Sequence, residues 1–165
     1  MTYLKIPPTL RNYVIPRHVL ERTREFLSER GERGVEGVVL WLGEIVDDDT
    51  GSVIAAYVPE QITHRSELGV AVEVTKEGLT RLITGLPDGV FVLIRVHSHP
   101  TDAFHSDLDD DNMLISHANG ISIVVPDFAR EPIVLERCSV NELRHDAGWV
   151  ELDPDEVRGR FRVVA

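Results

Sequence analysis

The chain of 165 residues is 42% hydrophobic and 27% charged, which is typical of one globular domain, and we expect that domain to span residues 1–165. Its formal net charge of −11 at pH 7 excludes nucleic acid as a favoured partner, because an acidic surface repels the phosphate backbone. No apolar run approaches the roughly 20 residues that span a bilayer, and the first residues lack the apolar segment of a secretory signal, so we expect a cytoplasmic location without membrane contact.

Helices and strands are expected to alternate along the chain. In residues 17–30 apolar side chains recur every three to four positions, as in an amphipathic helix, with Pro16 at its start and Gly31 suited to cap its end. Residues 36–46 are almost continuously apolar, as in a buried strand, and residues 52–59 indicate its partner. The elements expected after these are a helix over residues 76–84, a strand over 90–97, a helix over 107–118, strands over 121–125, 132–139 and 147–151, and a short helix that starts at Asp153 and Pro154.

This order of elements predicts a single α/β or α+β domain with a mixed sheet flanked by helices. The single cysteine, Cys138, lies in the apolar run of residues 132–139. We expect it to be a small buried side chain, because one cysteine can form neither an internal disulfide nor a cysteine metal cluster.

Two histidines at the end of a predicted strand are the main candidates for chemistry. His97 and His99 are two residues apart, so in a strand both side chains project from one face and both imidazoles can approach one cation. Pro100 cannot donate a ladder hydrogen bond and helps to end the strand. The sequence therefore predicts a metal site at the carboxyl end of this strand.

A catalytic zinc ion takes three protein ligands and keeps one position for water, so an aspartate is expected as the third ligand. The candidates that follow the histidines are Asp102, Asp107, Asp109, Asp110 and Asp111. With Ser106 as the N-cap of the next helix, Asp109 shares the side of Ser106, and Asp110 is rotated away by about 100°. We prefer Asp109 and keep Asp110 as the alternative; Ser106 could donate a hydrogen bond to a developing oxyanion.

Taken one by one, these features have ordinary explanations. A His-x-His pair is often a pair of surface histidines, and Ser-x-x-Asp before an apolar stretch is also a capping box. A glutamate such as Glu36, at the start of an apolar strand, is usually a solvated strand end. Their combination in this order is what favours a catalytic metal site.

The combination resembles the JAB/MPN family in its JAMM zinc metalloprotease form. Residues 97–100 (His-Ser-His-Pro) and 106–109 (Ser-Asp-Leu-Asp) are similar to the second half of the family signature. Residues 36–43 (EGVVLWLG) are similar to its first half, with the glutamate seven positions before the glycine. A strict count from the second histidine selects Asp110, whereas the Ser-x-x-Asp match selects Asp109.

The resemblance implies a curved mixed sheet flanked by helices and a role for each candidate residue. His97, His99 and Asp109 would hold Zn²⁺, Glu36 would act as general base towards the attacking water, and Ser106 would stabilise the oxyanion. The implied reaction is hydrolysis of a peptide or isopeptide bond.

The resemblance also implies a partner. The substrate would be a ubiquitin-like modifier protein, or a conjugate of one, cleaved after the C-terminal tail of the modifier. Residues 60–74, a polar segment, would form a flap over that substrate. A bacterial ubiquitin-like conjugation system in antiviral defence is one setting that the resemblance suggests.

Two other functions are kept open. The chain could be a catalytically inert JAB/MPN scaffold module, although such relatives typically lose ligand residues and this chain has a candidate for every role. It could also be a zinc amidase that acts on a small molecule or on a sulfur-carrier protein. Neither the modifier nor the oligomeric state follows from the sequence.

Overall fold

The computed structural model describes residues 7–67, 69–104 and 120–165 of the chain. Its helices and strands follow one another along the chain as β1 (Asn12–Pro16), α1 (Arg17–Glu32), β2 (Val38–Ile45), β3 (Thr50–Tyr57), β4 (Gln61–Ser66), β5 (Gly69–Val74), α2 (Lys76–Gly85), β6 (Phe91–Ser98), β7 (Ile121–Val125), β8 (Ser139–Arg144), β9 (Gly148–Glu151), α4 (Pro154–Arg160) and β10 (Phe161–Val164). Two short 3-10 helices, η2 (Asp127–Ala129) and η3 (Leu135–Arg137), lie between β7 and β8.

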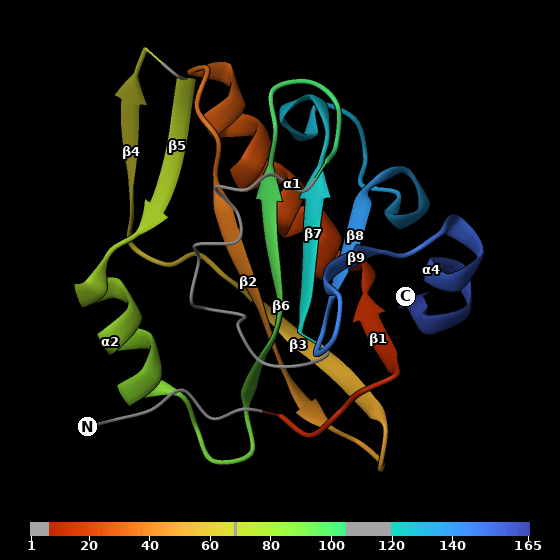
Figure 1. Cartoon of the computed structure of the whole chain (residues 1–165). Coiled ribbons are helices and arrows are strands. Elements are labelled where there is room, and N and C mark those ends of the chain that lie inside the picture. Colours follow the sequence, from red (N-terminus) through yellow and green to blue (C-terminus); the bar gives the residue numbers. More distant parts are fainter. Residues whose placement is uncertain (1–6, 68, 105–119) are drawn as a thin grey trace.

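One curled sheet of mixed direction organises the fold (Figure 1). Its strand order is β10-β1-β3-β2-β6-β7-β8-β9, and β4 and β5 form a separate two-stranded hairpin. The pairs β1–β10, β1–β3 and β6–β7 are parallel, and the pairs that flank them are antiparallel. The predicted α+β domain with a mixed sheet flanked by helices is therefore confirmed.

The two faces of the sheet are covered differently. Helix α1 lies behind the sheet in Figure 1 and packs its apolar stripe against the larger core cluster. Trp41 on β2 belongs to this cluster, and its indole N–H donates to the hydroxyl of Thr23 on α1 at 2.8 Å. On the opposite face Val38 and Leu40 of β2 pack with Leu82 of α2. Within the described residues no helix is long and apolar enough to cross a bilayer.

The helix over residues 17–30 is confirmed, but Gly31 is not its cap. Gly31 is buried inside α1, where an added Cβ would lie 2.3 Å from the Cβ of Phe128. The chain instead leaves the helix through Gly34, which has a φ of 69°. Position 31 is therefore a glycine because η2 packs too closely for a side chain, whereas Gly34 provides the left-handed turn that ends the helix.

The predicted strand over residues 132–139 is wrong. Residues 135–137 form η3, closed by hydrogen bonds from Arg137 N to Val134 O at 2.9 Å and from Cys138 N to Leu135 O at 3.1 Å. Leu135 is buried and Val134 is 42% exposed, but the backbone of residues 135–137 forms a turn and not a strand ladder. Cys138 is half-buried against the core, and burial raises the pKa of its thiol to about 12, which keeps it protonated.

An ion pair joins the last helix to the sheet. Arg160, at the end of α4, donates to the carboxylate of Glu142 on β8 at 2.6 Å, and Arg144 approaches the same carboxylate at 3.2 Å. Burial alone would raise the pKa of Glu142, but the two arginines outweigh it and hold the pKa below its ordinary value. The predicted start of α4 is confirmed, because Asp153 forms a capping box ahead of Pro154.

Candidate metal centre

The end of strand β6 places both predicted histidines on one buried face, with His97 in the strand and His99 directly after it. His97 is 1% exposed and His99 is 4% exposed. His97 pairs with Val38 of β2 across the antiparallel ladder, so the histidines face away from α1, on the side of Val38 and Leu40. Their ring centroids are 5.1 Å apart, with an angle of 62° between the ring planes. The predicted common face of the two imidazoles is therefore present.

Glu36 lies directly before β2, at the same end of the sheet. The register that pairs Val38 with His97 places Glu36 opposite His99 when it is continued by two residues. The chain is held there by two bonds between Gly37 and Ser98, from Ser98 N to Gly37 O at 3.2 Å and from Gly37 N to Ser98 Oγ at 3.0 Å. Opposed residues of an antiparallel pair share a face, so this register brings a half-buried carboxylate residue to the face of the histidines.

The backbone of His99 is held from the side of β7. Its N–H donates to Val125 O at 2.9 Å, and its carbonyl accepts from Phe128 N at 2.8 Å. Phe128 is the middle residue of η2, whose three residues Asp127, Phe128 and Ala129 have φ values of 53°, 53° and 54°. Left-handed backbone costs about 1–2 kcal/mol for each residue other than glycine. The fold therefore maintains a strained turn at the position that fixes His99.

Arg95 is a residue of this face that the sequence reasoning missed. It is 4% exposed, and its Nη1 lies 3.2 Å from Nδ1 of His97. A guanidinium can only donate, so this contact is a hydrogen bond only while Nδ1 is unprotonated, and zinc ligation by the neutral ring of His97 would end it. The signal for Arg95 was in the sequence, since it is a charged residue in an apolar strand and lies two positions before His97, on the same stripe.

The described part of the site fits a zinc ion. Imidazole nitrogen is a preferred zinc ligand, and two imidazoles bound to one tetrahedral zinc at about 2.0–2.1 Å have ring centroids about 5 Å apart. The observed separation of 5.1 Å is compatible with this arrangement, and it is also the spacing of an ordinary edge contact between two rings. No group of three His, Cys, Asp or Glu side chains gathers around one point within the described residues. The residues predicted to complete the site lie outside the described residues; they are Ser106, Asp109 and Asp110.

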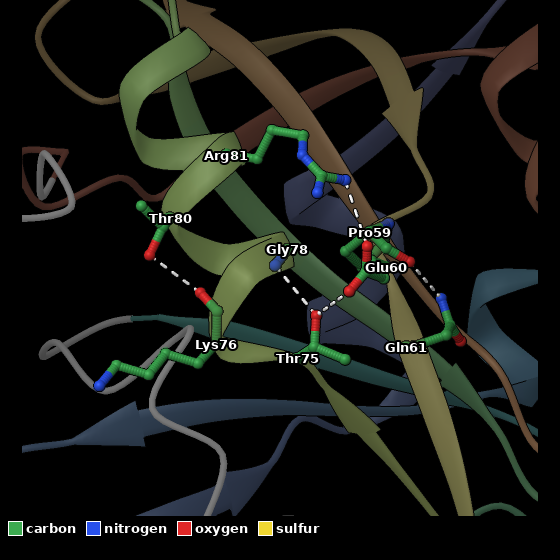
Figure 2. A network of polar contacts seen from close by, with 8 residues as sticks. All are labelled: Pro59, Glu60, Gln61, Thr75, Lys76, Gly78, Thr80 and Arg81. Atoms are coloured by element: carbon green, nitrogen blue, oxygen red, sulfur yellow. Dashed lines mark hydrogen bonds and ion pairs between the residues drawn. The ribbon is translucent and has the colours of Figure 1, made fainter.

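Residues 60–74, predicted as a flap, form the hairpin β4–β5 beside β2. The side-chain amide of Gln61 accepts from Val38 N at 2.8 Å and donates to Val38 O at 3.0 Å. These two bonds take the place of a neighbouring strand for the backbone of Val38, the residue that pairs with His97. Figure 2 shows the base of the hairpin, where Thr75 donates to Glu60 at 2.7 Å and Arg81 donates to Glu60 at 3.2 Å. The hairpin is thus attached next to the histidines, while its role as a flap stays a prediction.

A cavity of about 680 Å³ lies beside the segment that follows His99. Asp102 and Ala103 line it from this segment, and Ser139 lines it from the start of β8. Ser139 pairs with Val124, which in turn pairs with His97, so the cavity lies two strands away from His97, and His97, His99 and Glu36 do not line it.

Comparison with known proteins finds a relative that matches nearly the whole chain. A protein of Sinorhizobium fredii named "Probable metalloprotease y4jG" is 36% identical over 157 residues, which cover 94% of this chain and 95% of the relative. No protein-family model matches the chain.

Solved structures show the same fold at low sequence identity. The solution structure of a protein from Desulfitobacterium hafniense superposes with a TM-score of 0.58 at 18% identity and covers 92% of each chain. That of a protein from Salinibacter ruber gives a TM-score of 0.52 at 18% identity, covering 84% of this chain and 88% of the other. At 18% identity these two structures support the fold of this chain and nothing about its function.

Proposed function

The chain belongs to the family of the probable metalloprotease y4jG, and from this premise we propose that it is a metal-dependent hydrolase, a zinc protease of the JAB/MPN type. The observation that carries the proposal is the pair of buried imidazoles at the end of β6, with Glu36 at the opposed position just before β2. Two neutral nitrogen ligands and a nearby carboxylate are the components that a hydrolytic zinc centre needs.

Each residue then has one role in the reaction. His97, His99 and Asp109 would hold the zinc ion, with Asp110 as the alternative third ligand. A zinc ion held there would supply Lewis-acid chemistry, activating water for attack and polarising the scissile carbonyl. Glu36 accepts the proton of the attacking water and returns it to the leaving amine. Ser106 donates a hydrogen bond to the carbonyl oxygen as negative charge develops on it.

The substrate that we propose is a ubiquitin-like modifier, cleaved at the peptide or isopeptide bond after its C-terminal tail. The hairpin β4–β5 supports this choice. Within the described residues each of its strands has a ladder partner on one side only, so an extended tail can add to the hairpin as a further strand beside Glu36. A role in a bacterial conjugation or antiviral defence system is part of the same proposal.

A panel of fusions tests the proposal. Ubiquitin-like proteins of bacterial origin, each with a reporter after the C-terminal tail, are incubated with the wild-type chain, with Glu36→Gln and with the chelated chain. We expect cleavage after the tail by the wild type alone. Failure on every fusion together with turnover of small amides would favour a zinc amidase, and a chain that binds no zinc would favour an inert scaffold.

A further inference from the structure

One arginine links the segment of Glu36 to the hairpin. Arg30 lies in the last turn of α1, and its Nε donates to the carbonyl oxygen of Glu36 at 2.7 Å. Its Nη2 donates to Oγ1 of Thr63 on β4 at 2.9 Å. The planar guanidinium presents its donors in a fixed fork, so one side chain fixes the distance between these two acceptors.

The stem of Arg30 is enclosed on the side of the sheet. Its guanidinium carbon lies 5.8 Å from the ring centroid of Phe26. An added Cβ at Gly37 would lie 2.8 Å from Cδ of Arg30 and 3.1 Å from Cε1 of Phe26. Gly37 thus lets the backbone after Glu36 approach the stem closely, and the side chain has little room for another rotamer.

The two acceptors of Arg30 belong to parts of the proposed site with different tasks. On one side is the backbone of Glu36, whose next residue is bonded to Ser98 between the two histidines. On the other side is the inner face of the hairpin, where Thr63 pairs with Val72. We propose that Arg30 is a positioning residue that holds Glu36 and the hairpin β4–β5 in one fixed arrangement. This inference rests on the proposed function, in which Glu36 is the base and the hairpin receives the substrate.

The remaining attachments of the hairpin lie at its base. Gln61 bonds to Val38, and Glu60 bonds to Thr75 and Arg81, as Figure 2 shows for the contacts of Glu60. The Arg30–Thr63 contact is farther along β4, towards the turn of the hairpin. Loss of this contact should therefore leave the base attached and loosen the part of the hairpin beyond Gln61.

The test compares Arg30→Gln with the matched control Arg33→Gln. Arg33 is on the same helix end and is exposed, and it pairs with the exposed Glu29 at 3.3 Å. Two readouts are taken on the purified chain: amide hydrogen exchange of the hairpin, and kcat and KM on a cleavable ubiquitin-like fusion. For Arg30→Gln we expect exchange beyond Gln61 at least about tenfold faster and kcat about tenfold or more lower, since a shift of about 1 Å can cost 10²-fold. Zinc affinity should stay within about twofold, and Arg33→Gln should behave as wild type.

Two further variants separate the contact of Arg30 with Thr63 from its contact with Glu36. Thr63→Val removes the hairpin contact alone, so we expect faster hairpin exchange and a raised KM with kcat close to wild type. Arg30→Lys can hold one acceptor at a time, so we expect partial rescue. Unchanged hairpin exchange in both Arg30→Gln and Thr63→Val would overturn the inference, as would an unchanged kcat in an active Arg30→Gln enzyme. Absence of any hydrolysis by the wild type would count against the proposed function, while exchange would still decide whether Arg30 holds the hairpin.

Discussion

Substitution of Gly31 by alanine should perturb the candidate metal centre from the far side of the sheet. The new Cβ would lie 2.3 Å from Cβ of Phe128 and 3.2 Å from its carbonyl oxygen. A Cβ moves only with its backbone, so η2 has to shift. Overpacking of this kind costs about 1–3 kcal/mol, and alanine recovers up to about 1 kcal/mol of helix propensity. We expect a net loss of about 1–2 kcal/mol in the free energy of unfolding, or roughly 5 °C in Tm for a chain of this size.

The same shift should reach the metal. Phe128 N donates to the carbonyl of His99 at 2.8 Å, so displacement of η2 moves a proposed ligand, and loss of such outer support typically lowers metal affinity about 10–100-fold. Calorimetry of the metal-free chain and zinc competition against a chromophoric chelator measure the two effects. Gly159→Ala is the control, because Gly159 lies in α4 with no atom within 4 Å of the added Cβ, and it should be slightly stabilising without an effect on zinc. Wild-type stability and zinc affinity in Gly31→Ala would refute the reasoning.

The other predictions concern the site and the ion pair of the last helix. Glu36→Gln should bind zinc as wild type and lose at least about 10²-fold in kcat, and full turnover in this variant would remove Glu36 as the base. Asp109→Ala should weaken zinc binding more than Asp110→Ala in a metal titration, and the reverse order would assign the ligand to Asp110. Arg160→Gln should destabilise the fold by about 2–3 kcal/mol at pH 7, because it removes one of the two positive charges that offset the burial of the Glu142 carboxylate. The pKa of Glu142 is depressed in the folded state, so its stabilising contribution is present above the unfolded pKa of about 4.3 and fades as the pH falls through the folded pKa. The difference between wild type and Arg160→Gln in urea unfolding should therefore shrink below about pH 4, and a difference independent of pH would contradict this assignment.

The features of the site that could be predicted from the sequence are local ones. The period of two along a strand is sufficient to place His97 and His99 on one face, and the apolar run after Glu36 is sufficient to predict a buried strand. A glycine within this run, Gly43, has a physical reason that the sequence does not show. An added Cβ at Gly43 would lie 2.3 Å from the carbonyl oxygen of Ser52 on β3, so the close approach of two strands excludes any larger residue.

The features that sequence reasoning missed depend on contacts between distant segments. Strands β1 and β10 are short and pair with each other in parallel, which brings together residues almost 150 positions apart. Their patterns, NYVIP and FRVV, are too brief to indicate strands by themselves. The role of Arg30 is equally nonlocal, because an arginine at a helix end gives no sign of its acceptors on other elements.

Zinc stoichiometry, measured by elemental analysis on the purified wild-type chain and on the His97→Ala/His99→Ala variant, tests whether the two imidazoles belong to a metal centre. Circular dichroism of both proteins controls for folding, since the histidines are buried. We expect about one zinc ion bound to each wild-type chain and none to the variant, because removal of two ligands leaves too few to hold the ion. A folded wild-type chain that binds no metal, or a variant that binds as much zinc as the wild type, would contradict the assignment of His97 and His99 as ligands.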